Sequence, residues 1–141
     1  MQVVVMNKST VEDYAMSKHE NTSVVISIAS RGSNKAFVVP CTVNNIKDVL
    51  FLNFNDTDDI SSIYGCIERK EAEEISKFVK KYSDEIDTII VQCEAGQSRS
   101  AGTAAAIMKY LFNDDTEIFN NQRYTPNMLC YRMVLDALMN S

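Results

Sequence analysis

The sequence has few of the residues that build metal sites and disulfide frameworks. Its 141 residues include one histidine, His19, and four widely separated cysteines, none of them in a C-x-x-C pair: Cys41, Cys66, Cys93 and Cys130. A structural zinc site needs several such ligands at short spacings, so no metal site is expected. Two disulfides would require an oxidising compartment, and four free thiols in a reducing compartment are the simpler interpretation.

Long apolar runs and an excess of basic residues are also missing. No segment approaches the length of a membrane span, and residues 1–8 lack the basic lead and apolar core of a signal peptide. The net charge of −5 argues against a nonspecific nucleic-acid binder, which carries clustered lysine and arginine. We therefore expect a cytoplasmic protein that binds neither membranes nor nucleic acids. The sequence leaves its oligomeric state open.

The composition is that of a soluble globular protein, with 45% hydrophobic and 23% charged residues. The length fits a single domain over residues 1–141. Apolar runs typical of strands alternate with helical patterns, which predicts an α/β fold with a mostly parallel central sheet of about four to five strands flanked by helices. We expect strands at 2–6, 23–29, 49–54 and 88–91, a short extended piece at 37–43, and helices at 10–20, 67–82, 100–112, 113–119 and 126–140.

The segment from Thr88 to Gly102 organises the chain. Residues 88–91 are short, apolar and β-branched, as in a strand buried on both faces, and residues 100–112 favour a helix. The turn between them therefore lies at a helix N-terminus, where unpaired N–H groups and the helix dipole attract anions. Gly96 permits the backbone angles that such a loop needs.

A thiol and a guanidinium flank this turn, at Cys93 and Arg99. A cysteine close to N–H groups and a fixed positive charge has a lowered pKa, and arginine can bind two phosphate oxygens at once. A free cysteine is usually a small, buried hydrophobic residue with no catalytic role, and the Cys93–Arg99 spacing on its own is weak evidence because it can arise by chance. The agreement of strand, glycine, loop and helix is what favours a nucleophile aimed at a phosphoryl group.

The residues Cys93-Glu94-Ala95-Gly96-Gln97-Ser98-Arg99-Ser100 resemble the phosphate-binding loop of the cysteine-based protein tyrosine phosphatases, and the short chain resembles their compact dual-specificity-like branch. The resemblance implies a parallel sheet flanked by helices and hydrolysis through a phosphocysteine intermediate, without metal or organic cofactor. It implies that Cys93 is the nucleophile and that the Ser100 hydroxyl donates a hydrogen bond to the sulfur and eases its departure. The phosphate would be bound by the loop residues Glu94, Ala95, Gly96, Gln97, Ser98 and Arg99.

Three aspartates follow the strand at 49–54, at positions 56, 58 and 59. Cleavage of a phosphate monoester needs a proton for the departing oxygen, which a loop carboxyl can supply. Asn55-Asp56-Thr57 resembles the family's acid loop, so Asp56 is the first candidate. Asp58 and Asp59 are the alternatives, although either could simply cap the following helix.

Other positions carry weaker expectations. The resemblance gives Asn127 the role of bracing the phosphate loop with its side-chain amide. Ser9 with Glu12 predicts a capping box, and Thr125 before Pro126 predicts a helix start. His19 is expected to contact the end of a helix as a solvated residue. Arg31 and Lys35 are expected to be solvated loop charges, with a place at the substrate entrance as the alternative. The tyrosines are expected to fill the core, with stacking on a substrate ring as the alternative: Tyr64, Tyr124 and Tyr131.

One departure from the family affects the chemistry. The residue before the cysteine is usually histidine, and here it is Gln92, a neutral amide that adds no positive charge. Glu94 and Gln97 leave the variable positions of the loop without basic residues, which disfavours polyanionic inositol phosphates. A phosphorylated protein, carrying phosphotyrosine or mixed phosphoresidues, or a small phosphate ester is the expected substrate.

Two other classes of function remain open. A phosphate-binding module that hydrolyses slowly or not at all is one, motivated by Gln92. A thiol-based arsenate reductase or sulfurtransferase is the other, and it would need Cys66 or Cys130 near the loop as a resolving thiol.

Overall fold

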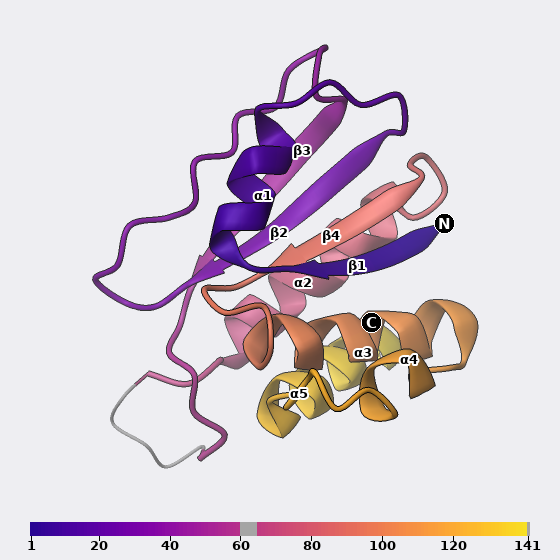
Figure 1. The fold of residues 1–141 in the computed structure, drawn as a ribbon. Coiled ribbons are helices and arrows are strands. Elements are labelled where there is room, and N and C mark those ends of the chain that lie inside the picture. The colour runs from indigo at the N-terminus through magenta and orange to yellow at the C-terminus, as the bar shows by residue number, and fades with distance from the viewer. Residues whose placement is uncertain (60–64, 141) are drawn as a thin grey trace.

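The computed structural model describes residues 1–59 and 65–140, which contain four strands and five helices (Figure 1). The strands are β1 (Gln2–Met6), β2 (Ser23–Ala29), β3 (Ile46–Asn53) and β4 (Thr88–Gln92). The helices are α1 (Lys8–Ala15), α2 (Arg69–Tyr82), α3 (Arg99–Phe112), α4 (Thr116–Phe119) and α5 (Met128–Met139). Tyr64, one of the tyrosines considered above, lies outside the described residues.

The four strands form one sheet in the order β1-β4-β2-β3, and every neighbouring pair is parallel. The predicted single α/β domain with a parallel sheet is confirmed. All five residues of β4 are buried, because β4 lies between β1 and β2 and its side chains enter a core on each face of the sheet. Parallel strands end at the same edge of a sheet, so the segments that follow β2, β3 and β4 begin near one another.

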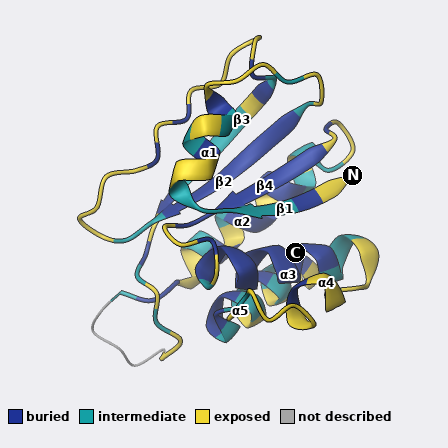
Figure 2. Cartoon of the chain, in the orientation of Figure 1, coloured by how far each residue is buried: buried dark blue, intermediate teal, exposed yellow. Residues whose placement is uncertain are grey.

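Helices cover the two faces of the sheet unequally (Figures 1 and 2). One core joins α2, α3 and α5 to side chains such as Ile26, Ile89 and Val91. A smaller core joins α1 to Val25 and Ile90 on the opposite face. Successive residues of β4 thus serve opposite cores, which explains why its sequence is a continuous apolar run rather than an alternating one.

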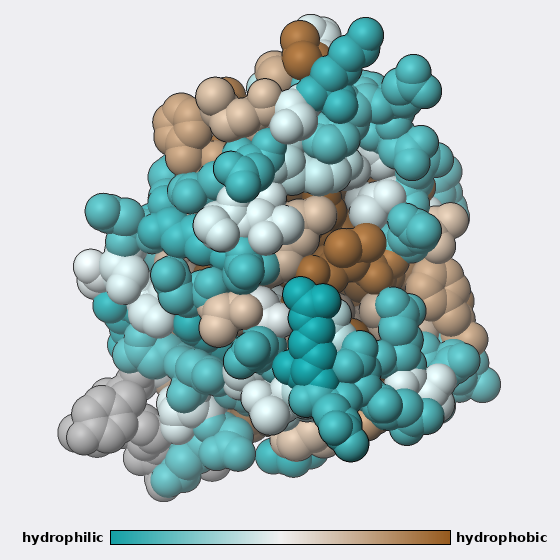
Figure 3. Space-filling view, in the orientation of Figure 1, coloured by the Kyte–Doolittle hydropathy of each residue, from teal (hydrophilic) through white to brown (hydrophobic). Residues whose placement is uncertain are grey.

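The short helix α1 leaves part of its face of the sheet uncovered. Figure 3 shows apolar side chains gathered in a hollow over β1 and β4, bordered by hydrophilic ones. A cavity of about 440 Å³ lies here, with Val4, Met6 and Ile90 among its lining residues. Among residues 1–59 and 65–140, no helix has the length and apolarity needed to cross a bilayer.

The start of α1 differs from the prediction. Asn7 is the N-cap, its side chain accepting a hydrogen bond from the Thr10 N–H at 2.8 Å, so the predicted capping box at Ser9 is wrong. The Glu12 carboxylate instead accepts from the backbone N–H of Phe37, at 2.8 Å. The helix ends at Ala15, before the predicted Glu20. The expected contact of His19 with the helix end is confirmed, because its Nε2 lies 2.8 Å from the Tyr14 carbonyl oxygen.

The start of β3 and the predicted extended piece at 37–43 also differ from the prediction. β3 begins at Ile46 rather than Val49, because Ile46 is buried in the smaller core. The extended piece predicted at 37–43 forms no strand. Its residue Val38, with the preceding Ala36, packs into the core beneath α1.

Helix α5 begins two residues later than predicted, at Met128 rather than at Pro126. Its N-cap is Asn127, whose side chain accepts from the Cys130 N–H at 3.0 Å, so the prediction of Thr125 as N-cap is wrong. The buried residues are Leu129, Cys130, Val134 and Leu138, whereas Met139 at the end of the helix is 65% exposed.

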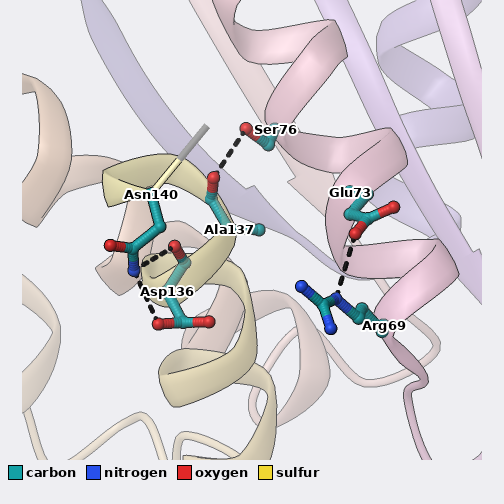
Figure 4. A network of polar contacts seen from close by, with 6 residues as sticks. All are labelled: Arg69, Glu73, Ser76, Asp136, Ala137 and Asn140. Carbon is teal, nitrogen blue, oxygen red and sulfur yellow. Dashed lines mark hydrogen bonds and ion pairs between the residues drawn. The ribbon is translucent and has the colours of Figure 1, made fainter.

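Helix α5 packs against α2 along a groove of about 340 Å³ (Figure 4). The Ser76 hydroxyl of α2 donates to the Ala137 carbonyl of α5, at 3.2 Å. On the α2 side of the groove, Arg69 and Glu73 form an ion pair of 3.1 Å. Asn140 closes the last turn of α5 through its hydrogen bonds to Asp136.

Gly102 sets the distance between α3 and the start of α5. A Cβ at this position would lie 2.3 Å from the carbonyl oxygen of Asn127. The missing side chain of Gly102 therefore allows a close approach to Asn127 at the start of α5. It brings the segment before α5 against the loop that precedes α3.

Candidate active site

The loop of residues 93–98 joins the end of β4 to the start of α3, at the centre of the sheet's carboxyl edge (Figure 1). Three of its carbonyl oxygens accept hydrogen bonds from backbone N–H groups outside the loop. The pairs are Glu94 with Lys8 at 3.2 Å, Gln97 with Thr125 at 2.9 Å, and Ser98 with Asn127 at 3.0 Å. These contacts fix the loop against the start of α1 and the segment before α5, at a helix N-terminus whose N–H groups favour an anion.

Gly96 is required at this turn for two reasons. Its φ is 65°, in the left-handed region that favours glycine. A Cβ would also lie 2.7 Å from the backbone nitrogen of Asn7 and 2.9 Å from the carbonyl carbon of Met6. The loop thus packs directly on the junction between β1 and α1.

The Cys93 thiol is 2% exposed, and its Sγ lies 3.0 Å from the Ser100 hydroxyl oxygen. Burial acts to raise the pKa of the thiol, but hydrogen bonds from the Ser100 hydroxyl and from the N–H groups of Ser100 and Gly96, with the charge of Arg99, lower it overall. The Ser100 hydroxyl, the N–H groups at the start of α3 and the loop, and the charge of Arg99 together favour a thiolate at Cys93.

We expect the Cys93 thiol to be alkylated with a pH midpoint below the ordinary cysteine value of about 8.5. Because the folded-state pKa is lowered, reactivity persists as the pH falls and is lost only below that midpoint. Iodoacetamide labelling over a pH series measures it, best in a Cys41→Ser background because Cys41 is exposed. Ser100→Ala should raise the midpoint. A midpoint at or above the ordinary value would contradict the lowered pKa of the Cys93 thiol.

The Arg99 guanidinium is buried, with 5% of the residue exposed, and it is anchored on one side. Its Nη1 donates to the Phe54 carbonyl oxygen at 2.8 Å and to the Ser30 hydroxyl oxygen at 3.0 Å. Within the part of the chain that the structure describes, Nε is buried without a hydrogen-bond partner. A buried N–H of a charged group is costly to leave unpaired, so this atom fits an oxyanion bound in the loop.

Asp56 lies against the same loop. Its Oδ1 accepts hydrogen bonds from the Ser98 hydroxyl at 2.7 Å and from the Asn127 side-chain amide at 2.9 Å. A cavity of about 330 Å³ is lined by Asp56, Asp58, Ser98 and Asn127, among others. The structure therefore brings Asp56 into contact with the loop of residues 93–98 and places Asp58 on the wall of the adjoining cavity. Asp59 is bonded locally, through its N–H to the Thr57 hydroxyl at 3.3 Å.

Asn127 braces the loop in a different way from the one expected. Its backbone N–H, not its side chain, binds the loop, at the Ser98 carbonyl. The side-chain amide donates to Asp56 and to the Thr57 carbonyl oxygen, the latter at 3.1 Å. Asn127 therefore connects the loop of residues 93–98, the aspartate-bearing segment of residues 55–59 and the start of α5.

Gln92 is 2% exposed and pairs across the sheet. Its Oε1 accepts a hydrogen bond from the Ser27 hydroxyl of β2, at 2.5 Å. The amide is not among the groups that lower the pKa of Cys93. The position thus contributes to the join between β4 and β2 rather than to the charge of the site.

The remaining candidates lie at the margin of the site or away from it. Glu94, Ala95 and Gln97 are exposed in the loop. Arg31 pairs with Glu68 at 4.0 Å, and the Lys35 ammonium lies 4.4 Å from the centre of the Phe51 ring. Tyr124 and Tyr131 pack against the larger core, and the Tyr131 hydroxyl donates to Asp115 at 2.5 Å.

The cysteines expected of a reductase are poorly suited to that role. Cys66 and Cys130 are both buried. Burial, with the nearby charge of Asp56, raises the pKa of the Cys130 thiol far above its ordinary value. In the ranges 1–59 and 65–140, no group of three or more histidine, cysteine, aspartate or glutamate side chains could hold a metal ion.

Sequence reasoning did not single out Ser27 or Ser30, although both contact site residues. Ser30 directly follows β2, and residues at the carboxyl ends of parallel strands commonly border a site. Its position after a predicted strand is the one signal in the sequence that could have found it.

Comparisons with known proteins agree with this architecture. The family model of the Rit1 DUSP-like domain matches residues 69–134, a stretch that includes Cys93, Arg99 and Asn127 but not Asp56. No curated protein matches the chain in sequence.

Solved structures share the fold over most of the chain. PTPMT1 in complex with PI(5)P has a TM-score of 0.61 and 16% identity, over 98% of this chain and 90% of that one. Human DUSP28 has a TM-score of 0.57 and 12% identity, over 97% and 91%. Human tyrosine phosphatase-like serine/threonine/tyrosine-interacting protein has a TM-score of 0.57 and 17% identity, over 82% and 76%. The chain therefore has the fold of the protein tyrosine phosphatases and dual-specificity phosphatases, which its phosphate loop resembles.

Proposed function

We propose that the domain of residues 1–141 is a cysteine-dependent phosphatase of the protein tyrosine or dual-specificity-like type, which hydrolyses phosphate monoesters through a phosphocysteine intermediate. The observation that carries this proposal is the pairing of the Cys93 thiol, whose pKa is lowered, with the buried and unpartnered Nε of Arg99. A nucleophile and an open oxyanion donor at one helix N-terminus are what phosphoryl transfer to sulfur needs.

In the first step the Cys93 thiolate attacks phosphorus. The P–S bond forms, the bond from phosphorus to the leaving oxygen breaks, and Asp56 gives its proton to that oxygen. Arg99 and the N–H groups of the loop hold the three nonbridging oxygens, over which charge is spread in the transition state. Asp56 is supported in this role by its contacts with Ser98 and Asn127, which hold Oδ1 at the loop and leave Oδ2 for the proton.

In the second step water attacks the phosphocysteine. The Asp56 carboxylate accepts a proton from the water, the P–S bond breaks, and sulfur leaves as the thiolate. The Ser100 hydroxyl, 3.0 Å from Sγ, donates a hydrogen bond to the departing sulfur. Both steps use groups of this chain alone, so the reaction is expected to proceed with a chelator present.

The surroundings of the loop favour a substrate with a single phosphate. The cavity beside Asp56 has Asp58 on its wall, and the loop presents Glu94 and Gln97 rather than basic side chains. A second phosphate near these groups would be repelled by the carboxylates. We infer that phosphotyrosine or mixed phosphoprotein substrates, or small phosphate esters, suit the site better than polyphosphorylated inositols. The four free thiols support a reducing, cytoplasmic location.

A second candidate function is binding of phosphorylated partners with little or no hydrolysis. Gln92 favours it, because an amide takes the place at which the family usually has a histidine. One structural neighbour is a human tyrosine phosphatase-like serine/threonine/tyrosine-interacting protein. The lowered pKa of Cys93 counts against it, since a module that only binds phosphate needs no thiolate.

We expect the purified protein to hydrolyse a generic aryl phosphate in the presence of reductant and EDTA. The rate should fall on the acid side as the Cys93 thiolate is protonated, with a midpoint below the ordinary thiol pKa of about 8.5. A pH series of initial rates measures this limb. Retained binding of phosphate or vanadate without turnover would favour the second candidate, and a rate that EDTA abolishes would contradict the metal-free mechanism.

A further inference from the structure

The anchored side of the Arg99 guanidinium joins the ends of three elements. Arg99 is the first residue of α3, Ser30 directly follows β2, and Phe54 directly follows β3. The Nη1 of Arg99 donates to the Ser30 hydroxyl at 3.0 Å and to the Phe54 carbonyl oxygen at 2.8 Å. These ends meet at the carboxyl edge of the sheet (Figure 1).

Two acceptors on one nitrogen determine where the rest of the group points. The guanidinium is planar and rigid, so fixing Nη1 at two positions also fixes the direction of the Nε–H bond. Nε is the atom that is buried without a partner within the described ranges. Its orientation therefore depends on the anchor at the other end of the same plane.

We propose that Ser30 is a positioning residue that aims Arg99 at a tetrahedral oxyanion held in the loop of residues 93–98. Its consequence for hydrolysis rests on the proposed phosphatase function, whereas its consequence for anion binding does not. Of the two acceptors, only the Ser30 hydroxyl belongs to a side chain, so it is the one that substitution can remove.

The neutrality of the serine matters as much as its position. A carboxylate at this place would hold Nη1 equally well but would offset part of the guanidinium charge. Within the described residues, neither salt bridge includes Arg99, so no carboxylate is paired directly with its guanidinium. A neutral acceptor therefore leaves that charge for the bound dianion. Ser30→Asp should keep the anchor and weaken anion binding.

Phe54, whose carbonyl oxygen accepts from Arg99, directly precedes the segment of residues 55–59 that carries the three aspartates. Phe54 donates its N–H to the Ala29 carbonyl oxygen at 3.0 Å, and Asn55 accepts from the Arg31 N–H at 2.9 Å. These bonds hold residues 54 and 55 without the Ser30 side chain. Loss of the hydroxyl should therefore disturb Arg99 and leave the position of Asp56 intact.

The test is binding of inorganic phosphate and of vanadate, measured by calorimetry on the wild type and on Ser30→Ala, Ser30→Thr and Ser33→Ala. Ser30→Ala should weaken binding about tenfold, as expected for one hydrogen bond to a charged group. Ser30→Thr keeps the hydroxyl and should bind as the wild type does. Ser33 is exposed in the same segment, so Ser33→Ala is the matched control.

The outcomes separate this inference from the proposed function. Unchanged anion affinity in Ser30→Ala overturns the inference, including the case in which only the melting temperature falls. If Ser30→Ala does not fold, the affinity of Ser30→Asp is measured instead. Wild-type anion affinity in Ser30→Asp would overturn the inference as well. A wild type that binds phosphate but does not turn over fails the phosphatase proposal alone, whereas a wild type that binds no anion contradicts both.

Discussion

Replacing Cys93 with serine is expected to lower kcat for aryl phosphate hydrolysis by at least about 10³-fold, the scale seen when an enzyme loses its nucleophile. A serine hydroxyl stays protonated in conditions where the Cys93 thiol, with its lowered pKa, ionises. The two side chains are similar in size, and Cys93 is buried, so the loop should keep its shape. Turnover measured beside calorimetric binding of inorganic phosphate checks the effect, because binding should persist in the variant.

The matched control is Cys41→Ser, which changes a thiol that is exposed and does not belong to the loop. Its activity should equal that of the wild type. Hydrolysis that survives in Cys93→Ser would exclude the phosphocysteine pathway, and another group would then have to be the nucleophile.

Replacing Asp56 with asparagine is expected to lower kcat by about 10²- to 10⁴-fold for alkyl phosphates, whose leaving oxygens need a proton. The loss should be smaller for an aryl phosphate with an acidic phenol, because such a leaving group departs without protonation. The side-chain oxygen of asparagine can still accept from Ser98 and Asn127, as Oδ1 of Asp56 does, so the geometry should be retained. Rates against a series of leaving groups measure the effect.

Asp58→Asn is the control for the acid, because Asp58 lies on the wall of the same cavity. It should change kcat little for any leaving group. If turnover is unchanged in Asp56→Asn but falls steeply in Asp58→Asn, the proton comes from Asp58, and the contacts of Asp56 with the phosphate loop are structural. The corresponding change at Asp59 tests the third candidate.

The strand–loop–helix around Cys93 could be predicted because its signals are local. The apolar run of β4, the left-handed turn at Gly96 and the small residues of α3 follow one another within a short stretch. Each favours the same structure, and no distant contact is needed to choose between alternatives. The same holds for the parallel sheet, whose strands read as continuous apolar runs.

The helix starts could not be placed, because several cap-competent residues lie within one turn. Asn7 and Ser9 can both cap α1, and Thr125 and Asn127 can both precede α5. Tertiary contacts decide between them: the Lys8 N–H binds the Glu94 carbonyl, and the Asn127 N–H binds the Ser98 carbonyl. The phosphate loop thus fixes where both helices begin.

The supporting hydroxyls were also beyond sequence reasoning. Ser30 reaches Arg99 across 69 positions, and Ser27 reaches Gln92 across 65. Both contacts depend on which strands are neighbours, and no local sequence pattern predicts the strand order β1-β4-β2-β3. The expected bracing role of Asn127 was assigned to the wrong group for the same reason, since the side chain binds Asp56 from the segment after β3.

The phosphocysteine intermediate itself provides the most direct test of the proposed mechanism. Without Asp56 to activate water, the intermediate should accumulate during turnover of an activated aryl phosphate. Acid quenching of Asp56→Asn, followed by mass spectrometry of the peptide that contains Cys93, should find one phosphoryl group on the Cys93 sulfur, and none when Cys93→Ser is added. Continued turnover with no covalent species, or a phosphoryl group on another residue, would contradict the mechanism.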